Sequence, residues 1–195
     1  MFEILQYDFI QNALIAGVLI SIAAGIIGSL VVVNKITFLT GGIAHSSYGG
    51  IGLAIYTGIP VLFGATVFAV ITAVLIAIIT LNNRNRIDAI IGMMWASGMA
   101  IGIIFVDLTS GYNVDLMSYL FGSIIAVSSE DIKYMFVMDI FIIAVIIYFY
   151  KEILAVSYDS EFATLRGINV KFFYTLILIL AALCVVAAIK AVGLI

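Results

Sequence analysis

The stretch 61-VLFGATVFAVITAVLIAIITL-81 contains no charged residue and ends just before a charged loop at residues 84–86. The hydrocarbon core of a bilayer is about 30 Å thick, and a helix of roughly 20 apolar residues crosses it. This stretch therefore predicts one membrane-spanning helix. Comparable apolar runs occur on both sides of it, so we expect a polytopic helical membrane protein of the all-α class.

The composition of the chain supports the same class. Hydrophobic residues make up 65% of the chain and charged residues 10%, with a mean hydropathy of +1.32. A soluble domain needs far more polar surface, so the main partner of this surface is expected to be the lipid bilayer. The net charge of −3 argues against nucleic acid as a partner. The single cysteine, Cys184, excludes an internal disulfide and is most simply a small buried hydrophobe.

Charged residues and the break at residues 58–60 divide the chain into about six predicted spans. Pro60 suits the start of a helix. The first apolar run is too long for the core of a signal peptide, so we interpret it as a retained span. Together the spans form one predicted transmembrane domain, residues 1–195. The predicted spans are residues 9–33, 41–57, 61–81, 89–106 and 132–150, and the run from 172 to the end of the sequence.

A further apolar stretch, residues 116–127, is short for a span, and we interpret it as a re-entrant or interfacial helix. Most basic residues then fall on one side of the membrane. The positive-inside rule places that side in the cytoplasm and the N-terminus outside the plasma membrane. If the stretch crossed the membrane, residues 151–171 would lie outside instead. The basic residues grouped in this way are Lys35, Arg84, Arg86, Lys151, Arg166 and Lys171. The opposite side holds mostly acidic residues, namely Glu3, Asp8, Asp107, Asp115, Glu130 and Asp131, together with Lys133 and Lys190.

Small residues recur at every fourth position in three of the predicted spans. Such a stripe lets helix backbones approach closely in lipid, where no hydrophobic effect drives helices together. We therefore expect most of these positions to serve helix packing. They include Gly17, Gly25, Gly50 and Gly92.

Residues 41–52, GGIAHSSYGGIG, are the most unusual part of the chain. So many glycines indicate close backbone packing or a locally broken helix that lines a cavity. The block holds the only histidine, His45, and an intramembrane histidine is a functional hypothesis by default. We assign His45 and the adjacent Ser46 to a translocation pathway. The alternative is that His45 only hydrogen-bonds a neighbouring helix.

A tight metal site is not expected in this chain. A tetrahedral zinc site needs about four ligands, which His45 and Cys184 cannot supply. His45 would act at most as a transient metal ligand, helped by a carboxylate or a water, and we expect no bound cofactor. Asp139, inside the fifth apolar run, is the second pathway candidate. A carboxylate there is costly, so Asp139 either faces a polar pathway or pairs with a backbone or hydroxyl group.

The polar region between the fifth and sixth spans contains a predicted short helix. Asp159 or Ser160 suits its N-cap, and Glu161 suits its first turn. Arg166 complements its C-terminal end, and Gly167 suits the left-handed position after it. A capped helix with apolar side chains in a cytoplasmic loop predicts a docking element, and the alternative is a linker on the membrane surface. The apolar side chains are those of Phe162, Ala163 and Leu165.

The sequence contains no GxxxxGK[ST] loop, so we do not expect this chain to hydrolyse ATP or to be an enzyme. It also lacks an arginine run for voltage sensing and a carbonyl-filter signature.

Several linked motifs resemble the permease family of zinc, manganese and iron ABC importers. VVVNK at residues 31–35 leads into the glycine- and histidine-containing block, and DAIIGM at residues 88–93 opens the fourth span. LFGSI at residues 120–124 precedes the fifth span, and residues 159–167 are similar to the family's ATPase-coupling segment. The resemblance covers nearly all of the chain. One departure is Gly42, since family members often have an aspartate three positions before the histidine.

The resemblance implies a permease homodimer with a pathway for divalent metal ions at its interface, leading into the cytoplasm. Two ABC ATPase subunits would bind the ATP and push on the helix at residues 159–167. An extracellular metal-binding protein would deliver the ion. Family members continue into further spans beyond residues 192–193, so the resemblance also implies that this chain is incomplete at its C-terminus.

The rival hypothesis is a secondary carrier, or a non-transporting membrane scaffold, that needs no ATPase. A secondary carrier is expected to show related halves in its sequence. We find no convincing internal repeat, and a co-purifying nucleotide-binding subunit would distinguish the two hypotheses.

Overall fold

A computed structural model describes residues 7–82, 87–109, 119 and 121–193, and these residues are almost entirely helical. No strand occurs among them, which confirms the predicted all-α class. Arg84, Arg86 and part of the predicted re-entrant segment lie outside the described residues. The helices are α1 (Asp8–Val33), α2 (Thr37–Thr57), α3 (Val61–Asn82), α4 (Ile87–Asp107), η3 (Ile124–Ala126), α6 (Ser129–Tyr148), α7 (Tyr150–Tyr158), α8 (Ser160–Leu165) and α9 (Val170–Val192).

The long helices agree with the prediction of about six spans. By length and composition, α1, α3, α4 and α9 can each cross a membrane, and α6 with α7 forms a bent fifth candidate. Helix α2 has 21 residues, but its glycine, serine and histidine residues make it less apolar than the others. Because twelve of its residues are buried, α2 is shielded from lipid by its neighbours.

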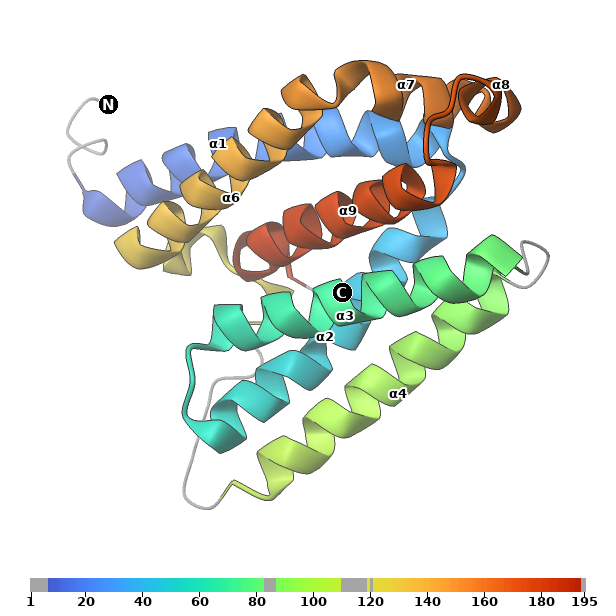
Figure 1. Cartoon of the computed structure of the whole chain (residues 1–195). Helices are drawn as coiled ribbons and strands as arrows, with labels where there is room; N and C mark the ends of the chain where they lie inside the picture. The colour runs from blue at the N-terminus through green and yellow to red at the C-terminus, as the bar shows by residue number, and fades with distance from the viewer. Residues whose placement is uncertain (1–6, 83–86, 110–118, 120, 194–195) are drawn as a thin grey trace.

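The helices form two groups that α9 joins (Figure 1). Helix α2 packs against α3 and α4, and α1 packs against α6. Helix α9 contacts α1, α2, α3 and α6, so it is the shared neighbour of both groups. Its buried face is built from Ile177, Leu180, Ala181 and other apolar residues. The apolar core therefore lies along the buried side of α9, and α2 packs on one side of it.

The fifth predicted span, residues 132–150, ends earlier than expected. Helix α6 stops at Tyr148, and α7 follows at an angle of 76°. The ring of Phe149 lies at this bend, 5.4 Å from the ring of Phe173 on α9. The bend lets α7 bury Ile153 and Val156. The sequence alone did not predict that this segment forms a helix of its own. The polar region thus holds two helices, α7 and α8, and not one.

The re-entrant or interfacial helix predicted at residues 116–127 lies partly outside the described residues, and its placement in the membrane stays a prediction. Residues 116–118 and 120 lie outside the description, Tyr119 and Phe121 are helical, and the 3-10 turn η3 follows at Ile124–Ala126. Gly122 has a φ of +66°, which interrupts any helix here. The backbone N–H of Ser123 donates to the carbonyl of Lys190 at 3.0 Å. This segment therefore contacts the end of α9 through its backbone.

Polar contacts mark the two ends of the bundle. At one end, the Asn34 amide donates to the Ser157 hydroxyl at 2.9 Å, which brings the α1–α2 turn beside α7. At the other end, the Lys190 ammonium lies 2.6 Å from a carboxylate oxygen of Asp131. The first contact joins two of the loops that the charge pattern groups on one side. The second joins two residues that it groups on the opposite side.

Candidate translocation site and docking surface

Helix α2 fits between its neighbours because glycines on both sides allow backbone contact. A Cβ on Gly50 would overlap the carbonyl oxygen of Gly64 on α3 and lie 2.6 Å from the Cβ of Phe68. On the α4 side, a Cβ on Gly98 would lie 2.5 Å from the Cα of Ser46. These distances leave no room for a side chain. The polar block of α2 is thus held rigidly against two helices.

The other glycines of the predicted packing stripes behave differently. A Cβ on Gly17 would make an ordinary contact of 3.7 Å with Ile124. Among the described residues, nothing lies within 4 Å of a Cβ built on Gly25 or Gly92. Gly25 and Gly92 therefore make no close helix contact among the described residues. Their role in helix packing stays a prediction for contacts with other segments or another subunit.

His45 is half-buried and stacks on Trp95 of α4. Their ring centroids lie 3.9 Å apart, and the rings are parallel to within 5°. The Nδ1 atom of His45 is buried and has no hydrogen-bond partner among the described residues. The alternative that His45 merely hydrogen-bonds a neighbouring helix therefore lacks a contact at Nδ1. Trp95 was not expected as a site residue, although it is the only tryptophan of the chain.

Ser46 and Gly42 lie one turn or less from His45 and limit what the site can hold. The hydroxyl of Ser46 is buried and donates to the carbonyl of Ile43 at 3.0 Å. A Cβ on Gly42 would overlap Cγ2 of Ile91 on α4. An aspartate at this position would need Ile91 to move. The space that the aspartate of other family members would need beside residue 42 is therefore occupied here by the side chain of Ile91. The pathway role of Ser46 remains a prediction.

Asp139 lies on α6 and is only 4% exposed. Its Oδ2 atom is buried without a hydrogen-bond partner among the described residues. Asp139 is close enough to Cys184 on α9 to interact with it electrostatically, whereas His45 lies against α4. Within the part of the chain that the structure describes, no three His, Cys, Asp or Glu side chains form a metal-binding group. Within the described residues, His45 and Asp139 are therefore separate polar groups on different helices.

The local prediction for residues 159–167 is confirmed. The Asp159 carboxylate accepts hydrogen bonds from the backbone N–H groups of Glu161 at 3.0 Å and Phe162 at 2.9 Å. Six residues of helix follow, and Gly167 has the expected left-handed conformation with a φ of +77°. The Arg166 guanidinium lies 5.2 Å from the centroid of the Phe162 ring. Both ends of this short helix are thus stabilised as the sequence indicates.

Helix α8 presents apolar side chains on its free surface. Ala163 is fully buried against the bundle, whereas Phe162 is 49% exposed and Leu165 is 87% exposed. A shallow depression of about 390 Å³ continues from Phe162 across α7, between Lys151 and Tyr158. We call this anchored helix, with its exposed Phe162 and Leu165 side chains, the docking surface.

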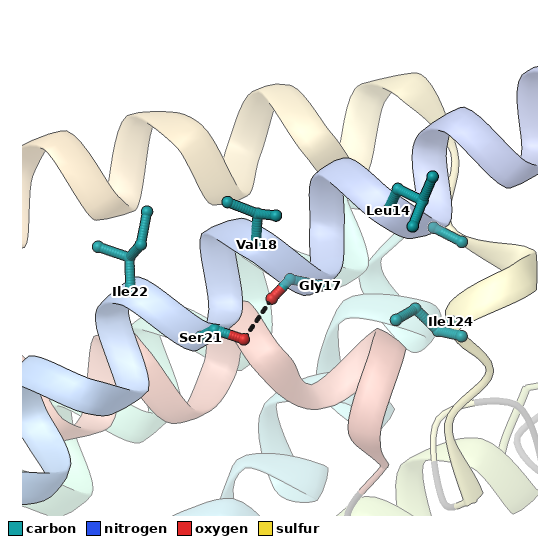
Figure 2. A pocket seen from close by; sticks show the side chains of 7 residues that line it. Leu14, Gly17, Val18, Ser21, Ile22 and Ile124 are labelled. Carbon is teal, nitrogen blue, oxygen red and sulfur yellow. Dashed lines mark hydrogen bonds between the residues drawn. The ribbon is translucent and has the colours of Figure 1, made fainter. Parts of the chain in front are cut away.

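A second groove, of about 550 Å³, lies along α1 and is closed at one end by Ile124. Figure 2 shows that Leu14, Val18 and Ile22 border it and that its one hydroxyl, that of Ser21, donates to the Gly17 carbonyl at 2.6 Å. The groove therefore offers no free polar group and lies apart from His45 and Asp139. We treat it as part of the lipid-facing surface of α1.

Sequence analysis missed the polar cluster at the start of α6. The Ser128 hydroxyl donates to Asp131 at 2.6 Å, and the Asp131 N–H donates back to that hydroxyl at 3.3 Å. The same carboxylate binds the Lys190 ammonium of α9. The spacing Ser-x-x-Asp ahead of an apolar run signals such a cap. Only the fold reveals Lys190 as the third member.

Comparison with known proteins gives this geometry its context. The model of the ABC 3 transport family matches residues 6–195. The chain belongs to the ABC 3 transport family. Membership of this family agrees with the interpretation of the chain as a membrane transport protein.

Several relatives align with nearly the whole chain. An uncharacterised membrane protein of Synechocystis, slr2045, is 45% identical over 100% of this chain and 69% of its own length. A probable metal transport system membrane protein of Chlamydia trachomatis is 38% identical, with 90% and 62% covered. The manganese transport system membrane protein MntC of Halalkalibacterium halodurans is 32% identical, with 99% and 66% covered. The chain thus spans between 62% and 69% of the length of these relatives.

Solved structures agree on the fold. PsaBC from Streptococcus pneumoniae, in complex with Fab, matches with a TM-score of 0.83 and 31% identity, over 97% of this chain and 68% of that chain. An inward-facing metal-chelate type ABC transporter matches with a TM-score of 0.71 at 15% identity, which supports the fold alone. The PsaBC match, together with the relatives above, supports the predicted resemblance to metal-transport permeases.

Proposed function

We propose that this chain is the membrane-spanning permease subunit of an ATP-driven importer of divalent transition-metal ions. The observation that carries the proposal is similarity over 99% of the chain to a protein named as a manganese transport system membrane protein. The proposed cargo is manganese, zinc or iron, moved into the cytoplasm. ATP is bound and hydrolysed by a separate ABC ATPase subunit.

The absence of a three-ligand metal group among the described residues is compatible with this role. Transport requires that an ion bind well enough to enter and weakly enough to leave. His45 supplies one imidazole with a buried, unpartnered Nδ1, and Asp139 supplies one buried carboxylate. In the proposed mechanism the ion contacts His45 transiently, with Ser46 and Asp139 contributing polarity along the pathway. A permease homodimer would place this pathway at its interface.

The proposed partners occupy opposite ends of the bundle. The ABC ATPase binds the docking surface on α8, where the side chains of Phe162 and Leu165 are exposed. Nucleotide-driven closure of the ATPase would then push α8 and α7. An extracellular metal-binding protein delivers the ion at the end that holds Asp131 and Lys190. The N-terminus lies outside the plasma membrane in this orientation.

Uptake of radioactive manganese by cells that express the protein with its ABC ATPase tests the proposal. His45→Ala should reduce uptake strongly while the amount of protein in the membrane stays normal. Thr57→Ala is the matched control on α2, because its exposed hydroxyl donates to carbonyls of its own helix, that of Leu53 at 2.8 Å and that of Ala54 at 3.4 Å. Normal uptake by His45→Ala, with less protein in the membrane, would show that His45 serves folding.

The rival function, a carrier or scaffold without an ATPase, predicts different results. Affinity purification in mild detergent should recover a nucleotide-binding subunit if the importer proposal is right. Uptake should also stop when that subunit carries an inactivating substitution in its ATP site. Ion uptake that continues in cells without any such subunit would favour the carrier.

A further inference from the structure

Trp95 is the closest aromatic neighbour of His45, and its role goes beyond the proposed function of the chain. The indole lies parallel to the imidazole, with 3.9 Å between the ring centroids and 5° between the planes. We infer that Trp95 is a positioning residue that fixes the plane of the His45 ring and thereby the direction from which a metal ion can bind. This inference rests on the proposed metal pathway through His45.

The argument starts from the geometry of imidazole. A metal ion binds a ring nitrogen through a lone pair that lies in the plane of the ring. Rotation of the ring about its Cβ–Cγ bond changes that direction and is only weakly restricted in a free side chain. A parallel indole covers one face of the ring and leaves its nitrogen edges open. The stack therefore restricts ring rotation without blocking the ligand.

Stacking replaces the usual means of orienting a metal-binding histidine. Such histidines normally donate their second ring N–H to a carboxylate, a carbonyl or a water, which sets the ring plane. The Nδ1 of His45 is buried and has no such partner among the described residues. Among the described contacts of His45, the stack on Trp95 is the one that can define the plane of the ring.

Trp95 is itself held in place. Its indole N–H donates to the sulfur of Met99, one turn along α4, at 3.1 Å. Close to the stack, the backbones of α2 and α4 touch where Gly98 meets Ser46. This close approach sets the spacing of α2 and α4 beside the stacked rings. Trp95 is therefore held in place beside the imidazole ring of His45, which would otherwise rotate more freely.

The first test uses Trp95 as a reporter, because it is the only tryptophan in the chain. Purified protein is titrated with manganese or zinc chloride while tryptophan emission is recorded, without ATP or an ATPase. A saturable emission change that disappears in His45→Ala supports the inference. Emission that does not respond to either ion, or responds equally in His45→Ala, overturns it.

The second test separates positioning from stability. In uptake assays, Trp95→Leu should raise the apparent KM for manganese about tenfold and change the maximal rate less than about twofold. Trp95→Phe keeps a flat aromatic face and should restore most of the affinity. An unchanged KM in Trp95→Leu overturns the inference, as does equal loss in both variants.

The two tests also distinguish this inference from the proposed function. If the wild-type protein takes up no metal with its ATPase, the importer proposal fails. The emission titration still decides whether Trp95 and His45 form a metal-responsive pair. If uptake is normal and emission is silent, the importer proposal stands and the role of Trp95 is refuted.

Discussion

Gly50 and Gly25 belong to the same kind of sequence stripe, yet replacing them with alanine should have opposite effects. A Cβ on Gly50 would lie 2.6 Å from the Cβ of Phe68 and would overlap the backbone oxygen of Gly64. Ordinary contact begins at 3.4 Å, so the first distance is about 0.8 Å too short. Neither contact involves the flexible end of a side chain. Helices α2 and α3 must therefore move apart to accept Gly50→Ala.

The expected magnitude follows from two opposing terms. Overpacking costs about 1–3 kcal/mol, and a clash with backbone belongs at the upper end of that range. Alanine favours the helix over glycine by about 1 kcal/mol, which offsets part of the cost. Gly50→Ala should thus destabilise the protein by about 2 kcal/mol, or about 4–8 °C in melting temperature. Gly25→Ala meets nothing within 4 Å and should be neutral or slightly stabilising.

Thermal unfolding of the purified protein in detergent, followed by size-exclusion chromatography, measures both variants. The expected result is a lower melting temperature for Gly50→Ala and an unchanged or higher one for Gly25→Ala. If the two variants melt at the same temperature, α2 and α3 are not in backbone contact. The inference that close backbone packing holds the His45 segment of α2 in place would then be wrong.

Three further predictions concern the two ends of the bundle. Lys190→Met should cost about 3–5 kcal/mol, measured by thermal unfolding, because it leaves the buried Asp131 carboxylate without its cation. Phe162→Asp should weaken ATPase binding by about 1.5–3 kcal/mol in a pull-down titration, since it removes one apolar anchor from the docking surface. Cysteine labelling of intact cells with a membrane-impermeant reagent should modify Glu130→Cys and leave Glu161→Cys unmodified, because the charge pattern places these exposed positions on opposite sides.

Each of these predictions has a contrary result. A melting temperature of Lys190→Met equal to that of wild type would show that the ion pair contributes nothing. Transport and assembly at the normal level in Phe162→Asp would make α8 a linker. Labelling of Glu161→Cys from outside, with Glu130→Cys protected, would invert the topology.

Local signals in the sequence predicted some features because they depend on neighbouring residues only. The caps of α8 are an example: Asp159 binds N–H groups two and three residues away, and Gly167 adopts a left-handed φ. The apolar lengths predicted the long helices for the same reason. Propensity and hydropathy are sufficient when the physical cause lies within one segment.

Other features could not be predicted because their cause lies in a distant segment. The bend after Tyr148 contains neither proline nor glycine, and it is filled by the contact of Phe149 with Phe173. The stack of His45 on Trp95 depends on the packing of α2 against α4. The same holds for Gly50 and Gly25, which the i, i+4 pattern cannot distinguish. Burial on a given side of a helix is a property of the fold.

The central position of α9 has a consequence for how the protein is made. Helices α2, α3 and α4 follow one another in the chain, so they can pack together while synthesis continues. Helix α9 begins at Val170, more than a hundred residues after the end of α1, although it covers faces of both α1 and α3. Until α9 inserts, the faces of α1 and α3 that it covers remain in lipid. The time needed to synthesise the chain as far as α9 therefore delays this packing. The partly assembled protein is the form that membrane chaperones and proteases encounter during that time.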